Sequence, residues 1–177
     1  MEQQDEEIKE LTRLLNLVWG SEELAYERLN RLRDSYNCDL FNAMLSLVQV
    51  AFVPESFFTD LLGNRTSAGS RYEPASTYME ATICLGPRVL ESTELAPIVL
   101  LHEMIHHWEL TLAQDLYLFE YPSTVDVLID RIFSDPIRAR KWRATHSKRF
   151  LAKAHEISTK REIDLATLLY GHMHLRR

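Results

Sequence analysis

Two histidines and a glutamate lie close together at His102-Glu103-Met104-Ile105-His106, in the pattern H-E-x-x-H. Residues four apart on an α-helix lie on one face, one turn apart, so both imidazoles can bind a single metal ion. Glu103 follows the first histidine and can act as a general base beside the ion without binding it. A catalytic zinc has three protein ligands and an open position, and it lowers the pKa of water to about 7. The motif therefore predicts a Zn²⁺ site in which His102 and His106 bind the metal and Glu103 accepts a proton.

The residues around this motif are apolar, as expected for a buried helix. Glu103 is the only charged residue between Ala96 and Trp108. Burying two histidines and a carboxylate costs free energy unless these groups have partners, and a metal ion would be such a partner. His107 points about 100° away from His106 on a helix, so we expect it to lie behind the ligands or at the surface and not to bind metal.

The residues alone leave the third ligand open, because no Gly and His follow His106 at the spacing of the extended motif. The candidates elsewhere are four histidines and three carboxylates: His146, His155, His172, His174, Glu120, Asp126 and Glu156. An oxyanion-stabilising group is equally open. No pattern selects among its candidates, which are Arg71, Tyr72 and Tyr78.

The elements that must position these residues follow from apolar spacing and turn signals. Helical spacing predicts helices over 5–19, 21–36, 39–47, 94–112, 123–133, 147–160 and 163–170. Gly20 ends the first of them, and Ser21 can cap the next. Short β-rich segments predict strands over 48–53, 71–72 and 78–85. We expect an α+β fold with N-terminal helices, a small, mostly antiparallel sheet, and C-terminal helices after the motif helix.

The composition is typical of one globular domain. The chain has 177 residues, of which 46% are hydrophobic and 26% charged, and this balance argues against a disordered chain. Two cysteines, Cys38 and Cys84, are too few for a disulfide framework, so we expect both to be reduced. Residues 2–10 are acidic, unlike a signal peptide, and no apolar run is long enough to span a membrane. We therefore expect a cytoplasmic protein with no membrane partner.

Charge is unevenly distributed along the chain. Residues 1–130 contain 8 Lys and Arg against 22 Asp and Glu, whereas residues 131–161 contain 10 against 2. The basic segment 131–161 can contact DNA or an acidic partner. The simpler interpretation is a solvated helix face that pairs with the acidic part of the chain.

Three blocks occur in an order known from one enzyme family. The first comprises Asn64–Tyr72 and the apolar stretch Ala81–Leu85, the second is Val99–His107, and the third is His146-Ser147-Lys148-Arg149-Phe150. Together these blocks resemble the SprT-like (Spartan-like) zinc metallopeptidases, over about residues 24–160. Ser147 stands where the family usually has Gly. The gap between His106 and His146 is longer than usual, which indicates an insertion over about 110–140.

The resemblance implies a zincin-like fold over a single domain, 1–177, with His146 as the third zinc ligand and Phe150 as a core anchor. It also implies hydrolysis of peptide bonds in a protein substrate, which in several members is attached to DNA. The family's optional four-cysteine zinc ribbon is absent from this sequence.

Two other functions compete with this interpretation. The first is a non-catalytic zinc-containing module that binds DNA or a protein. Glu103 argues against it, because a structural zinc site is usually closed by four ligands and needs no base. The second is a peptide deformylase-like hydrolase with Cys84 as an upstream ligand, although the deformylase signatures are missing. Metal content and the ligand type, thiolate or imidazole, distinguish the deformylase from the metallopeptidase.

Overall fold

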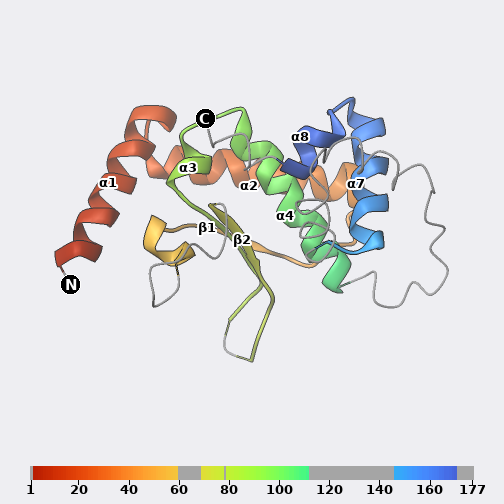
Figure 1. Ribbon diagram of the computed structural model, residues 1–177, viewed down its shortest axis with the longest axis horizontal. Helices are drawn as coiled ribbons and strands as arrows, with labels where there is room; N and C mark the ends of the chain where they lie inside the picture. Colours follow the sequence, from red (N-terminus) through yellow and green to blue (C-terminus); the bar gives the residue numbers. More distant parts are fainter. Residues whose placement is uncertain (1, 60–68, 78, 112–145, 171–177) are drawn as a thin grey trace, which may run out of the picture.

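The computed structural model describes residues 2–59, 69–77, 79–111 and 146–170, and it has an α+β fold (Figure 1). Its elements in chain order are α1 (Glu2–Trp19), α2 (Glu22–Phe41), β1 (Gln49–Phe52), the 3₁₀-helix η1 (Glu55–Phe58), β2 (Ser70–Glu73), β3 (Thr82–Leu85), α3 (Pro87–Leu90), α4 (Leu95–Thr111), α7 (Lys148–Arg161) and α8 (Leu165–Tyr170). The α+β class expected from the sequence is therefore confirmed.

The turn between α1 and α2 forms where the sequence predicts it. Gly20 adopts a φ of +88°, a left-handed conformation that glycine takes at little steric cost. Ser21 caps α2, because its hydroxyl oxygen accepts a 3.0 Å hydrogen bond from the Leu24 N–H. The indole N–H of Trp19 donates to the Leu90 carbonyl at 2.8 Å, which ties the end of α1 to α3.

The second helix ends later than predicted. α2 continues to Phe41, so the separate helix predicted over 39–47 is wrong. Asn42 then adopts a φ of +54°, which asparagine tolerates better than most residues. The Asn37 side chain bonds both backbone groups of Leu45, its amide to the carbonyl at 3.1 Å and its oxygen to the N–H at 3.0 Å. Because these bonds occupy groups that a helix would use, the chain turns away toward β1.

The sheet is mixed, so the expectation of a mostly antiparallel sheet is wrong. Its strand order is β1-β3-β2, with β1 parallel and β2 antiparallel to the central β3. Turn signals report on strands that follow one another, whereas β1 and β3 are separated in sequence by β2. β3 begins at Thr82, four residues later than predicted, and its Ile83 and Leu85 are fully buried.

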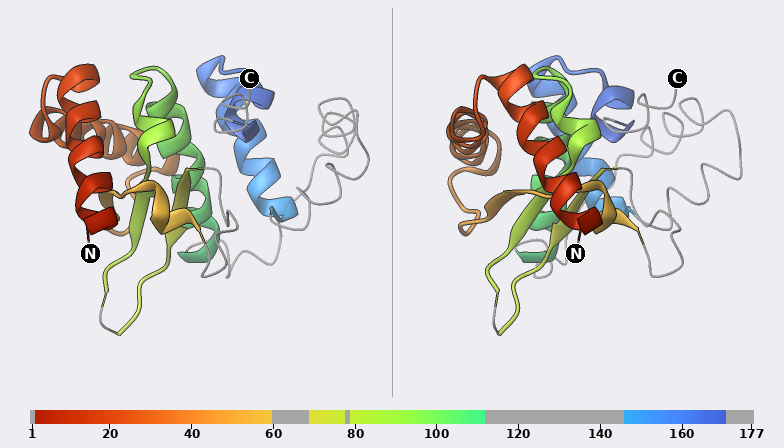
Figure 2. Two further views of the ribbon diagram at one scale, coloured as in Figure 1. Left: turned by 60° about the vertical axis from the view of Figure 1, so that its left-hand side comes forward. Right: turned by 90° about the vertical axis from the view of Figure 1, so that its left-hand side faces the viewer.

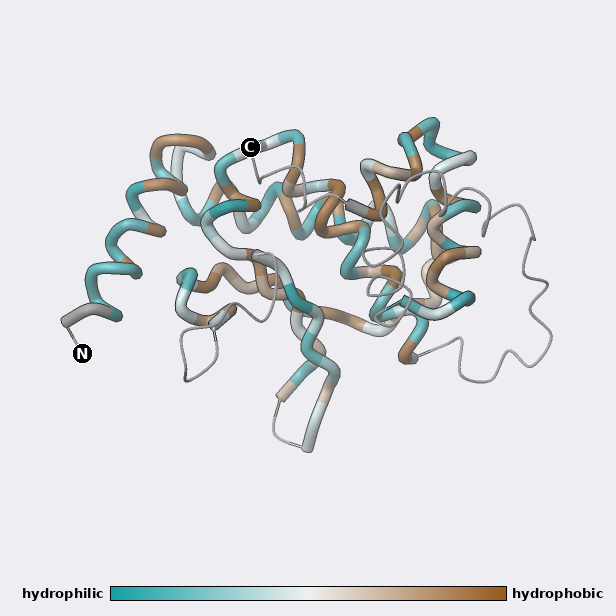
Figure 3. The backbone as a smooth tube through the Cα atoms, in the orientation of Figure 1, coloured by the Kyte–Doolittle hydropathy of each residue, from teal (hydrophilic) through white to brown (hydrophobic). Residues whose placement is uncertain are grey.

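Helix α4 lies at the centre of the molecule. It packs against α2, α3, α7 and α8 and against strands β2 and β3. Figure 2 shows it between the N-terminal helices and the blue C-terminal pair. Ten of its residues are buried: Ala96, Val99, Leu100, Leu101, His102, Glu103, Met104, Ile105, His107 and Trp108. By contrast, the first turns of α1 are largely hydrophilic (Figure 3).

The helices predicted around the motif are confirmed within about two residues, as α4, α7 and α8. The predicted helix over 123–133 and most of the expected insertion over 110–140 lie outside the described residues. No helix in the part of the chain that the structure describes is long and apolar enough to cross a membrane.

Candidate metal centre

Side-chain caps set the starts of α4, which carries His102 and His106, and of α7, which His146 precedes. The Ser92 hydroxyl accepts hydrogen bonds from the N–H groups of Glu94 and Leu95, at 3.3 and 3.1 Å. The Ser147 hydroxyl caps α7 in the same way, with Phe150 N–H at 3.3 Å. Ser147 also donates to a carboxylate oxygen of Glu109 on α4, so it joins the two helices.

Three imidazoles converge at this junction. One nitrogen from each of His102, His106 and His146 lies within 4.8 Å of the other two, so the group could hold a metal ion. The ring centroids are 5.1, 5.2 and 5.0 Å apart, so the rings surround one point almost symmetrically. His102 and His106 come from adjacent turns of α4, as predicted, and His146 lies two residues before α7.

One of the nitrogen–nitrogen separations agrees with a tetrahedral metal ion. The Nε2 atoms of His102 and His146 are 3.3 Å apart. With metal–nitrogen bonds of about 2.0–2.1 Å, two ligand nitrogens in a tetrahedral zinc site lie about 3.3–3.4 Å apart. Nδ1 of His102 lies 3.0 Å from the Leu168 carbonyl oxygen on α8. A carbonyl only accepts, so Nδ1 carries the proton and Nε2 of the neutral ring keeps a lone pair for a cation.

The floor of the site is apolar. The ring centroid of Phe150 lies 4.9, 4.4 and 4.6 Å from those of His102, His106 and His146. Phe150 is fully buried, and His102 and His146 are only 2% and 9% exposed. The predicted core anchor therefore packs directly against all three imidazoles, and it restricts the orientations that their rings can take.

Glu103 follows His102 on α4, and its buried carboxylate is held from strand β2. It is 4% exposed, and its Oε1 accepts a 2.7 Å hydrogen bond from the Ser70 hydroxyl. The Tyr72 backbone N–H also bonds the carboxylate. Burial raises the pKa of Glu103 to about 7, whereas the bonds from Ser70 and Tyr72 favour the charged form and lower it. A carboxylate with such a pKa changes its protonation near neutral pH, as a general base requires.

His107 is fully buried, so the prediction of a possible surface position is wrong. It is not part of the histidine group. Its Nδ1 lies 2.9 Å from the Tyr72 hydroxyl, and its Nε2 lies 3.1 Å from the Ser46 carbonyl. Burial lowers the pKa of His107, which favours the neutral ring. This histidine therefore joins α4 to β2 and to the loop before β1.

The other ligand candidates do not join the group, within the described residues. His155 is half-buried on α7 and lies outside it, and Glu156 is exposed and pairs with Lys153 at 2.9 Å. Cys84 is buried on β3, where burial raises the pKa of its thiol to about 11, and it is not part of the group. The remaining candidates lie outside the described residues: Glu120, Asp126, His172 and His174.

The oxyanion candidates are engaged elsewhere or fall outside the described residues. The Tyr72 hydroxyl bonds His107, Arg71 pairs with Glu73, and Tyr78 is not among the described residues. Ser70 was not identified as a functional residue from the sequence, because a serine after a glycine at the start of a strand is an ordinary turn signal.

The described part of the basic segment 131–161 contacts acidic and aromatic groups of the same chain. Arg161 pairs with Asp39 at 2.6 Å, and Lys160 donates to the Asp39 carbonyl at 2.5 Å. Lys153, which pairs with Glu156, lies over the rings of Phe41 and Trp108, at 5.3 and 5.6 Å from their centroids. These contacts agree with a basic face that pairs with the acidic part of the chain.

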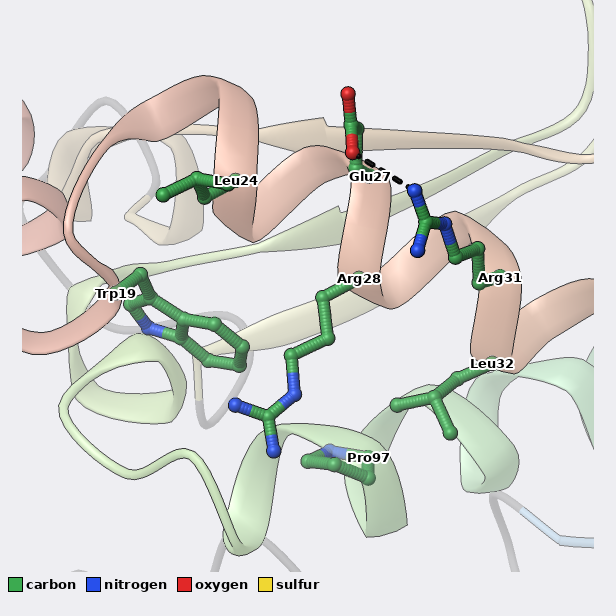
Figure 4. Close-up of a pocket in the computed structure, with 7 residues that line it drawn as sticks. All are labelled: Trp19, Leu24, Glu27, Arg28, Arg31, Leu32 and Pro97. Carbon is green, nitrogen blue, oxygen red and sulfur yellow. Dashed lines mark hydrogen bonds and ion pairs between the residues drawn. The ribbon is translucent and has the colours of Figure 1, made fainter.

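A separate hollow of about 640 Å³ lies between α2 and the start of α4 (Figure 4). The Arg28 guanidinium lies over the Trp19 ring at 5.7 Å from its centroid, and Arg31 pairs with Glu27 at 3.1 Å. The lining residues include none of the three histidines: they are Trp19, Leu24, Glu27, Arg28, Arg31, Leu32 and Pro97. This hollow is therefore distinct from the candidate metal centre.

No protein-family model, curated protein or solved structure matches this chain. What the centre does must therefore be inferred from its residues and their geometry.

Proposed function

We propose that this protein is a zinc-dependent metallopeptidase that hydrolyses peptide bonds in a protein substrate. The observation that carries this proposal is the convergence of three imidazole nitrogens within 4.8 Å of one another, with the buried carboxylate of Glu103 next in sequence to the ligand candidate His102 on α4. The described residues supply three ligand candidates, which is the number in a catalytic zinc site with an open position, whereas structural sites are usually closed by four.

Zinc is the metal that this donor set favours. Neutral imidazoles suit zinc, and the 3.3 Å separation of two of the ring nitrogens agrees with its tetrahedral geometry. When bound, zinc would polarise the substrate carbonyl and make a water molecule more acidic. His102, His106 and His146 would hold the ion, and the Leu168 carbonyl would keep His102 in the tautomer that binds.

Glu103 would supply the acid–base chemistry. It takes the proton of the attacking water and passes it to the amine nitrogen that leaves. The hydrogen bonds from Ser70 and the Tyr72 backbone N–H favour the ionised form, which is the form that accepts a proton. Phe150 and the buried surroundings keep competing water away from the other faces of the imidazoles.

The SprT-like resemblance supports a zincin-like arrangement and a protein substrate. His146 just before α7 and Phe150 beneath the imidazoles are consistent with that family's third block, from which Ser147 departs. The proposal extends to protein substrates attached to DNA, and this extension depends on the basic segment 131–161.

The proposal can be tested by comparing cleavage of casein and histone by the wild type and by Glu103→Gln. We expect the wild type to bind about one zinc per chain and to cleave, and Glu103→Gln to bind zinc and lose at least about 10²-fold in rate. Glu94→Gln is a matched control, because Glu94 is an exposed carboxylate next to the start of α4. Equal cleavage by the wild type and Glu103→Gln, or no cleavage by zinc-loaded wild type, would favour the non-catalytic binding module.

A further inference from the structure

Helix α4 presents two pairs of residues at a spacing of four, offset by one position along the chain. The first pair, His102 and His106, faces α7 and His146. The second pair, Glu103 and His107, faces strand β2, where Ser70 bonds Glu103 and Tyr72 bonds His107. Successive helical residues are rotated by about 100°, so the two pairs occupy adjacent faces of one helix. The six residues His102 to His107 therefore serve two separate surfaces.

The two bonding side chains on β2 match this second face of the helix. Ser70 and Tyr72 are two residues apart, and residues at that spacing point to the same side of a strand. The Tyr72 backbone N–H adds a further bond to the Glu103 carboxylate. The carboxylate therefore has two donors from one strand, and its position depends on where that strand lies.

The direction of each hydrogen bond around His107 can be assigned. The Ser46 carbonyl only accepts, so His107 Nε2 carries the proton and donates to it at 3.1 Å. The Ser46 hydroxyl oxygen, 3.2 Å from the same nitrogen, is then a second acceptor for that proton. In the neutral ring Nδ1 is then an acceptor, and the Tyr72 hydroxyl donates to it at 2.9 Å. Tyr72 is thus anchored through its hydroxyl while its N–H bonds Glu103, so His107 fixes the strand that holds the carboxylate.

We propose that Ser70 is a positioning residue for Glu103, and that the bond between Tyr72 and His107 fixes β2 so that Ser70 and the Tyr72 N–H hold the carboxylate in place. This inference rests on the proposed function, since it assigns Ser70 to the acid–base step of that reaction. Ser70 touches neither the metal ligands nor the substrate carbonyl in this assignment, and it acts only through Glu103.

The first test separates turnover from substrate binding. We expect Ser70→Ala to lower kcat about tenfold or more, with KM and zinc content close to wild type, because only the general base is misplaced. Ser70→Thr keeps the hydroxyl and should restore most of kcat. Tyr72→Phe keeps the backbone N–H but loses the anchor, so it should lower kcat less than Ser70→Ala. Ser35→Ala, at an exposed serine on α2, is the control.

The second test needs no activity and no metal. Unfolding of zinc-free wild type, Ser70→Ala, Glu103→Leu and the double variant at pH 8.5 forms a thermodynamic cycle. If Ser70 bonds the buried carboxylate, the double variant's unfolding equilibrium constant should differ by about tenfold or more from the value that the two single variants predict together.

Additive effects in this cycle, or wild-type kcat in Ser70→Ala, would overturn the positioning role in an otherwise active enzyme. Zinc-loaded wild type that cleaves neither casein nor histone would instead overturn the proposed function itself, whatever the cycle shows.

Discussion

Replacing His146 by Ala tests whether the three imidazoles act together on one ion. His102 and His106 share a helix, whereas His146 reaches the same point from the start of α7. Its Nε2 lies 3.3 Å from that of His102, so removing the His146 ring removes one of the three proposed ligands. Four-ligand zinc sites bind with about 10–16 kcal/mol, or roughly 3–4 kcal/mol per ligand, so we expect zinc affinity to fall about 10²–10³-fold.

Zinc affinity can be measured by competition with a chromophoric chelator, and zinc content by elemental analysis after gel filtration. A thermal shift gives an independent measure. Free zinc at 1,000 times Kd stabilises the native state by about 4 kcal/mol. For a chain of this length that corresponds to a rise in Tm of roughly 8–16 °C. The wild type should show this rise, and His146→Ala should lose most of it at the same zinc concentration.

His155→Ala is the matched control, because His155 lies on α7 outside the histidine group. It should bind zinc as the wild type does. If His146→Ala binds zinc within threefold of wild type, the ion is held by other residues and the three-imidazole centre is refuted. Equal losses of zinc affinity in His146→Ala and His155→Ala would indicate damage to α7 as a whole. That result would also refute the three-imidazole centre.

Three further predictions follow from the same contacts. Phe150→Ala should destabilise the zinc-free protein by about 3–5 kcal/mol in urea unfolding, because it leaves a cavity beneath the imidazoles; a loss under 1 kcal/mol would contradict this packing. Burial raises the pKa of Glu103 in the zinc-free native state to about 7, against 4.5 in the unfolded chain. The unfolded chain therefore ionises first, and the native state loses stability as the pH rises from 4.5 to about 7. Glu103→Gln should therefore gain stability relative to wild type over that pH range, by at most about 3 kcal/mol, and parallel pH profiles would refute the assignment. Because Arg161 and Lys153 already pair within the chain, we expect only weak duplex DNA binding that falls steeply between about 50 and 200 mM salt in a mobility-shift assay; tight binding independent of salt would contradict it.

Helix α4 and its ligand pair were predictable because the relevant spacing is local. Two histidines four residues apart share a helix face whatever surrounds them, and the apolar run before His102 predicts burial. The cap at Ser21 was predicted for the same reason, and those at Ser92 and Ser147 are equally local, since each acts within three residues of its own position.

The remaining features depend on contacts between distant residues. His146 could not be chosen over His155 from spacing alone, and only the family resemblance selected it. Nothing local marks His107 as a link to Tyr72 and Ser46, which lie 35 and 61 residues away. The parallel pairing of β1 with β3 likewise joins segments that no turn signal connects.

The contact between His102 and the Leu168 carbonyl makes the helix after α7 part of the candidate metal-binding unit. A fragment trimmed to residues 24–160 would keep every ligand and Glu103, yet His102 would lose the acceptor that selects its protonation isomer. Groups that orient ligand histidines in this way are worth about 10–100-fold in metal affinity. We therefore expect the smallest fragment that binds metal well to extend beyond the last proposed ligand, to a backbone oxygen that no motif search would detect.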